Sequence, residues 1–61
     1  MQLSEKETQT LVDRLRALNV VTWELVGLVP AKGNAALINV LETIVNETDV
    51  LVARYDREAG E

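Results

Sequence analysis

The chain has 61 residues, 48% of them hydrophobic, and this length limits it to one small domain. Six lysines and arginines stand against ten aspartates and glutamates, and the net charge of −4 excludes the dense basic patch that duplex nucleic acid requires. Cysteine and histidine are absent from the sequence, which excludes disulfides, thiolate metal sites and the usual general base near neutral pH.

These exclusions predict a binding protein that is not an enzyme and that uses no metal and no cofactor. No apolar run approaches the roughly 18 residues of a membrane span. The opening stretch MQLSEKE also lacks the apolar core of a signal peptide. We therefore expect a cytoplasmic protein with no membrane partner.

The first predicted helix covers about residues 5–29. Ser4 and Glu7, three positions apart, are typical of a capping box at a helix start. Mostly apolar residues then recur at spacings of four and three, which predicts one packing stripe along the helix. Its members are Leu11, Leu15, Leu18, Thr22, Leu25 and Val29.

The helix breakers of the chain gather near its midpoint. Pro30 and Gly33 predict a turn over residues 30–34, and Asn34 is placed to cap a following helix. A connection of about five residues favours an antiparallel neighbour. The chain 1–61 should therefore fold as a single helical hairpin.

The second predicted helix covers about residues 35–58, with Gly60 as its stop signal. Its stripe repeats the four-three spacing through Leu37, Leu41, Ile44, Thr48, Leu51 and Tyr55. Together with a neighbouring valine and isoleucine row, the apolar arc is ~160° wide, against the ~100° of an ordinary surface helix. This excess predicts an all-α antiparallel hairpin that assembles into a dimeric four-helix bundle or a larger oligomer. The expected partner or oligomer interface contains Val12, Trp23, Val26, Ile38, Val45, Val52 and Tyr55.

Two groups of basic and turn residues are candidate anion sites. Lys32, Gly33 and Asn34 would form an anion cradle with the first amides of the second helix, or simply a turn with a surface lysine. A second group gathers where the start of the first helix meets the end of the second, and it contains Arg14, Arg16, Arg54 and Arg57. These arginines would bind phosphate between subunits, or else form salt bridges with Asp13, Asp56 and Glu58.

Trp23, the only tryptophan, lies off the main stripe of the first helix. Such an aromatic residue serves as an interface anchor or stacking platform, or packs within a homo-oligomer. Thr22 and Thr48 interrupt the stripes, and we expect each hydroxyl to bond a carbonyl of its own helix. The alternative for these threonines is a polar lining for a ligand pocket.

The layout from Ser4 to Arg54 resembles the short helical-hairpin sponges with which phages counter CBASS immunity by sequestering cyclic oligonucleotide signals. The likeness rests on a charged first helix, a proline turn and the stretch LETIVNETDVLVAR, which matches family positions at Leu41-Glu42, Val45 and Ala53-Arg54.

This chain departs from the family at Asn39-Val40, where the family has Thr-Lys before Leu-Glu, and Asn39 is included among the candidate ligand-binding residues. The resemblance implies a phage-encoded protein in the host cytoplasm that oligomerises and binds cyclic di- or trinucleotides between subunits.

The stretch LVDRLRALNVVTWELV is also similar, with a one-residue shift, to the first helix of small phage anti-activators that bind a host quorum-sensing regulator. The similar positions are Leu11, Asp13, Leu15, Arg16, Trp23, Leu25 and Val26. This second resemblance implies an inhibitor that docks on a host protein through a hydrophobic helical face.

Overall fold

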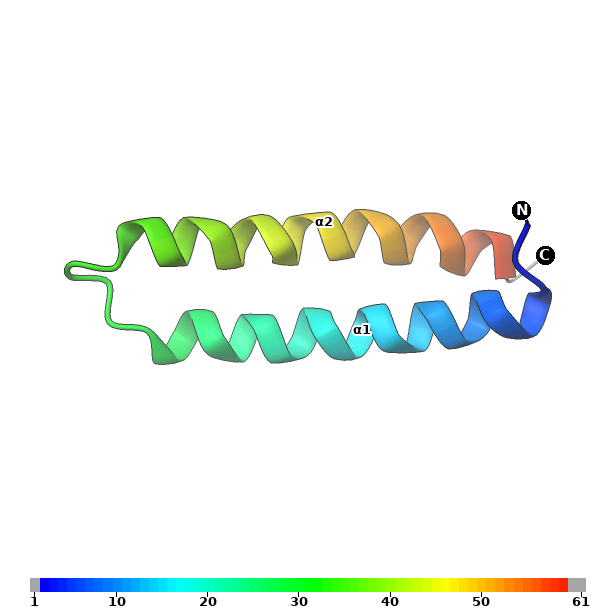
Figure 1. Cartoon of the computed structure of the whole chain (residues 1–61), viewed down its shortest axis with the longest axis horizontal. Coiled ribbons are helices and arrows are strands. Elements are labelled where there is room, and N and C mark those ends of the chain that lie inside the picture. The colour runs from blue at the N-terminus through cyan, green and yellow to red at the C-terminus, as the bar shows by residue number, and fades with distance from the viewer. Residues whose placement is uncertain (1, 60–61) are drawn as a thin grey trace.

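The computed structural model describes residues 2–59, with side chains through residue 57. Helix α1 (Glu5–Leu28) and helix α2 (Ala35–Ala59) run antiparallel as a hairpin that measures 44 × 17 × 15 Å (Figure 1). The helix bounds agree with the predicted ones to within one residue. The predicted stop at Gly60 and the side chain of Glu58 lie outside the described residues.

The capping box predicted at the start of α1 is confirmed. The Ser4 hydroxyl accepts a hydrogen bond from the Glu7 amide at 3.0 Å, and the Glu7 carboxylate accepts one from the Ser4 amide at 2.9 Å. The bond from the Ser4 backbone, followed by the bond with its side chain, lowers the pKa of Glu7, which is fully exposed. The charged form of Glu7 therefore helps to hold the first turn of α1 in place.

The turn between the helices uses its breakers in the predicted way, but Asn34 acts differently from the prediction. Gly33 has φ of +82°, which L-residues with a side chain rarely adopt. The side-chain nitrogen of Asn34 donates a hydrogen bond to the Pro30 carbonyl at 2.8 Å, so this side chain connects the two ends of the turn. The Asn34 backbone carbonyl accepts the first helical bond, from the Ile38 amide at 3.0 Å.

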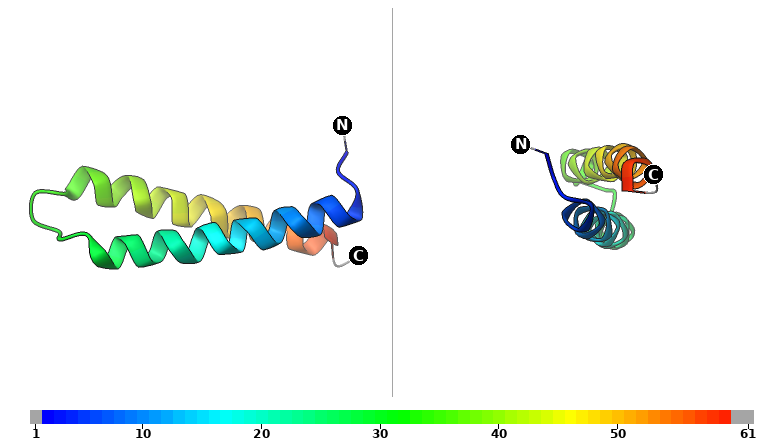
Figure 2. Two further views of the ribbon diagram at one scale, coloured as in Figure 1. Left: turned by 60° about the horizontal axis from the view of Figure 1, so that its bottom comes forward. Right: turned by 90° about the vertical axis from the view of Figure 1, so that its right-hand side faces the viewer.

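Figure 2 shows the two helices from two further directions, and their side chains pack along a single seam. Seam residues are buried or half-buried and follow one another at alternating spacings of four and three. This repeat of 3.5 residues is that of an antiparallel coiled coil. The seam consists of Thr8, Val12, Leu15, Asn19, Thr22 and Val26 of α1, Val29 directly after α1, Asn34 directly before α2, and Ile38, Leu41, Val45, Thr48, Val52 and Tyr55 of α2.

The seam corrects two predictions about apolar faces. Six of the seven residues expected at a partner or oligomer interface, all except Trp23, lie in the seam of a single chain instead. Conversely, Leu18, Leu25 and Leu37, expected on the packing stripes, are 48%, 43% and 48% exposed. Valine, threonine and asparagine fill most seam positions, whereas most leucines, apart from Leu15 and Leu41, lie beside the seam.

Threonines inside the seam satisfy their hydroxyls locally, as predicted. Thr22 donates to the Leu18 carbonyl at 2.7 Å and Thr48 to the Ile44 carbonyl at 2.8 Å, each within its own helix. Thr8 does the same with the Ser4 carbonyl at 2.9 Å. Among the described residues, no buried side-chain nitrogen or oxygen is left without a hydrogen-bond partner. The polar seam positions therefore carry little desolvation cost.

Candidate functional site

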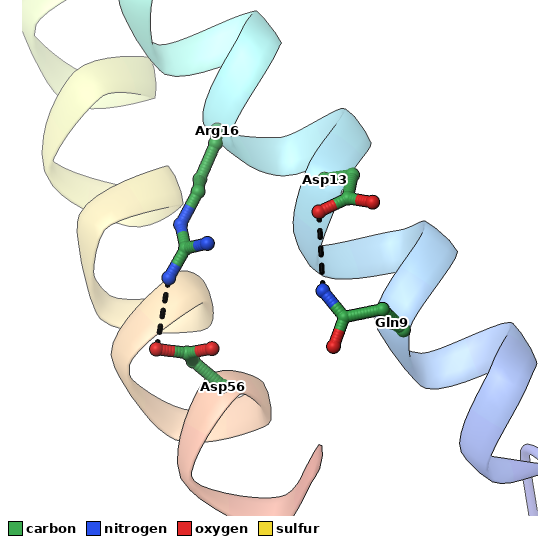
Figure 3. Close-up of polar contacts among 4 residues, drawn as sticks. All are labelled: Gln9, Asp13, Arg16 and Asp56. Carbon is green, nitrogen blue, oxygen red and sulfur yellow. Dashed lines mark hydrogen bonds and ion pairs between the residues drawn. The ribbon is translucent and has the colours of Figure 1, made fainter. Parts of the chain in front are cut away.

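The four arginines predicted to cluster do lie at the open end of the hairpin, but not on one side of it, because Arg16 directly follows a seam position whereas Arg14 and Arg54 directly precede one. Arg16 forms an ion pair with Asp56 across the helices, 2.8 Å between the nitrogen and oxygen (Figure 3). Arg54 places its guanidinium carbon 5.7 Å from the centre of the Tyr55 ring. Among the side chains that the structure describes, which end at residue 57, no ion pair joins Arg14, Arg54 or Arg57 to another residue. The salt-bridge interpretation is thus observed for Arg16.

The candidate anion cradle lies at the other end of the molecule. Lys32 and Gly33 are exposed in the turn, and Asn34 is half-buried beside them. Asn39 is exposed on the first turns of α2, where its carbonyl accepts the Thr43 hydroxyl at 2.8 Å. Because the long dimension of the chain is 44 Å, one chain cannot bring the turn residues and the open-end arginines to the same small ligand.

One flank of the seam carries charged and aromatic side chains, and we call it the polar flank. Its residues each directly follow a seam position, and they are Arg16 and Trp23 of α1 and Glu42, Asp49 and Asp56 of α2. Trp23 is 54% exposed there and lines an open hollow of about 210 Å³ with Glu42, Val45 and Asn46. An indole beside a carboxylate suits a cationic or apolar side chain better than a phosphate.

Asn19 is the residue that links the two helices most directly, and the sequence analysis gave it no such role. Its side-chain nitrogen lies 3.1 Å from the Val45 carbonyl, 2.8 Å from the Thr48 hydroxyl and 2.9 Å from an Asp49 carboxylate oxygen. A polar residue that finds its partners in only one alignment fixes the register of a coiled coil. Its position at a seven-residue spacing from Val12 and Val26 is the signal that would have placed it in the seam.

The opposite flank is apolar along most of its length, and we call it the leucine face. Its residues each directly precede a seam position, and in an antiparallel pair such positions of both helices share one side. They are Leu11, Leu18 and Leu25 of α1 and Leu37, Ile44 and Leu51 of α2. Near the turn the face is widened by Val21, Leu28 and Val40, which are 52%, 76% and 57% exposed. An apolar surface that spans both helices is typical of a site for another protein surface.

The described residues hold no group of three or more acidic side chains close enough together to bind a metal ion. Neither helix, over the described residues, has both the length and the apolar character needed to cross a bilayer. Within the described part of the chain, the features that bear on function are the open-end arginines, the polar flank with Trp23 and the leucine face.

Comparisons with known proteins return no relative. No family model, no curated protein and no solved structure matches the chain.

Proposed function

We propose that the protein is a phage-encoded, non-enzymatic binding protein that self-associates and sequesters cyclic oligonucleotide signals between its subunits.

 The single observation that carries the proposal is that Arg14, Arg16, Arg54 and Arg57 share the open end of the hairpin, where only Arg16 has an ion-pair partner among the side chains described through residue 57. A guanidinium group offers the paired donors that fit a phosphodiester.

The need for a second subunit follows from where these arginines lie. Arg14 belongs to α1 and Arg54 to α2, and both are exposed on the outside of the hairpin. A ligand that carries two or three phosphates would be enclosed only if another copy supplied the opposite wall. A sponge needs no catalytic group, which agrees with a sequence that contains no histidine or cysteine.

Calorimetric titration with a panel of cyclic di- and trinucleotides tests the proposal. We expect saturable heat with at least one member, and chromatography should recover that nucleotide intact, which separates sequestration from hydrolysis. The double variant Arg14→Gln and Arg54→Gln should weaken binding at least tenfold. Lys32→Gln removes one positive charge at the far end and should leave binding within about twofold of wild type. The absence of heat with every nucleotide at high micromolar concentration would contradict the proposal.

A second candidate function is inhibition of a host regulatory protein, and the observation that favours it is Trp23. This residue is 54% exposed beside the hollow on the polar flank, so it is available as an anchor for a partner. The acidic chain would favour a partner with a basic rim. In a pull-down with purified candidate regulators, Trp23→Ala should stay folded and lose the partner. Equal capture by a folded Trp23→Ala variant would count against this function.

A further inference from the structure

We propose that the leucine face is the surface on which a second copy of this chain docks, and that the two hairpins form a four-helix bundle with both turns at the same end. The inference specifies the self-association on which the proposed function rests. It depends on the leucine face and on its rims, and it requires no nucleotide.

The chain exposes more surface than a folded monomer of its mass, and the excess is about the area that one partner would cover. The hairpin exposes 4824 Å², whereas a folded monomer of 6.8 kDa typically exposes roughly 4,000 Å². The excess of about 800 Å² equals the area that each partner loses in an interface of standard size. Two helices with a single seam leave this surplus because each of them has only one neighbour.

The chemistry of the leucine face selects a second copy as its occupant. Its six residues are aliphatic, and the two helices contribute three each at the same seven-residue spacing. An identical face laid against it supplies the same repeat, so that the side chains interdigitate as in the layers of a four-helix bundle. The polar flank, which holds Arg16 and Trp23, remains outside this contact.

The rims of the leucine face fix the relative direction of the two copies. The rim near the turn is apolar and contains Val21, Leu28 and Val40, and the rim near the open end is charged and contains Arg14, Glu47 and Arg54. With the turns at the same end, α1 of one copy lies beside α2 of the other, and apolar rims meet apolar rims. With the turns at opposite ends, the charged rim would lie against exposed valines and lose its hydration.

The same-end arrangement also brings arginines of different subunits together. Arg14 and Arg54 lie at similar heights along the hairpin, because Asn19 is level with residues 45–48 across the seam. Arg14 of one copy would therefore approach Arg54 of the second copy at the open end. Two like charges at a subunit boundary favour an anion between them, which is the chemistry that the proposed ligand supplies.

The first test compares molecular mass by light scattering at micromolar concentration. Wild type should have twice the 6.8 kDa chain mass, and Leu18→Lys should have the mass of one chain. The matched control is Val20→Lys, which is 56% exposed on α1 outside the leucine face, against 48% for Leu18, and it should stay dimeric. A monomeric wild type, or a dimeric Leu18→Lys, would overturn the proposal.

Circular dichroism of the same variants covers the case in which Leu18→Lys does not fold. Both substituted residues are about half exposed in the single chain, so a single hairpin should tolerate either lysine equally. An unfolded Leu18→Lys beside a folded Val20→Lys would therefore support a partner on the leucine face. Equal unfolding of the two variants would overturn it.

The second test measures the direction of the two copies. The chain has no cysteine, so Ala31→Cys in the turn gives a single site for a nitroxide label. Turns at the same end should give a label-to-label distance of roughly 20 Å, about two helix diameters. A distance near the 44 Å length of the hairpin would overturn the same-end arrangement. Titration of nucleotides into the dimeric wild type then separates failure of ligand binding from failure of association, because a dimer that binds no nucleotide would contradict only the proposed function.

Discussion

Replacing Asn19 with alanine removes the side chain that joins the helices across the seam. Its amide has two N–H groups shared among three acceptors, so about two hydrogen bonds are lost, each worth about 0.5–1.5 kcal/mol. The loss does not leave these side-chain acceptors unsatisfied, because the Thr48 hydroxyl keeps its hydrogen bond to the Ile44 carbonyl and Asp49 is exposed to water. We therefore expect Asn19→Ala to lower the free energy of unfolding by about 2 kcal/mol.

That loss is large for a chain of this size. A 61-residue domain typically unfolds with about 3–9 kcal/mol, and the melting temperature falls by about 4–8 °C per kcal/mol. Urea unfolding followed by circular dichroism measures the change, and protein concentration must be the same for each variant because association shifts apparent stability.

Asn46→Ala is the matched control for this measurement. Asn46 is exposed on α2, so the same substitution carries the same gain in helix propensity, up to about 0.7 kcal/mol, with no hydrogen bond across the seam. The difference between the two variants isolates the contribution of the Asn19 amide. If Asn19→Ala and Asn46→Ala differ by less than about 0.5 kcal/mol, the reasoning that Asn19 joins the helices is refuted.

Three further predictions concern the ends of the molecule. The pKa of Glu7 is lowered in the folded chain. The stabilisation from the charged Glu7 side chain is therefore present above the unfolded pKa of about 4.3 and is lost as pH falls through the lower folded value. Glu7→Gln should reduce the pH dependence of the free energy of unfolding in that window. A double-mutant cycle on Arg16 and Asp56, both about half exposed, should give a coupling energy of about 0.2–1 kcal/mol in urea unfolding, and the coupling should shrink in 1 M salt. Gly33→Ala should destabilise the hairpin by about 1 kcal/mol because Gly33 has φ of +82°. Gly27→Ala inside α1 should instead stabilise it by up to about 1 kcal/mol. Thermal melts in which both variants shift the melting temperature in the same direction would contradict this.

The sequence was sufficient to predict the helices because their ends are local signals. Ser4 with Glu7 begins α1, and Pro30 with Gly33 forces the turn, whatever the rest of the chain does. The seam was harder to predict because two rows at seven-residue spacing compete on α1. Hydrophobicity favoured the row of Leu18, but the row of Asn19 packs inside.

The reason lies in partners that are distant in sequence. An asparagine in a packed seam is costly unless hydrogen-bond acceptors are present, and those of the half-buried Asn19 are 26 to 30 residues away on α2. The open-end arginines were correctly predicted to share one end of the hairpin. Which side of the hairpin each arginine occupies depends on which row of α1 forms the seam, so this arrangement could not be predicted before the packing of the helices was known.

The position of Trp23 determines what ultraviolet fluorescence reports about this molecule. Trp23 is the only tryptophan, so the emission spectrum belongs to one site on the polar flank. Opening of the hairpin separates its indole from Val45 and Asn46 on α2 and should change the emission. Docking on the leucine face takes place on the other side of the seam and should leave the emission unchanged. The protein therefore carries a natural optical probe that distinguishes unfolding of a subunit from dissociation of an assembly.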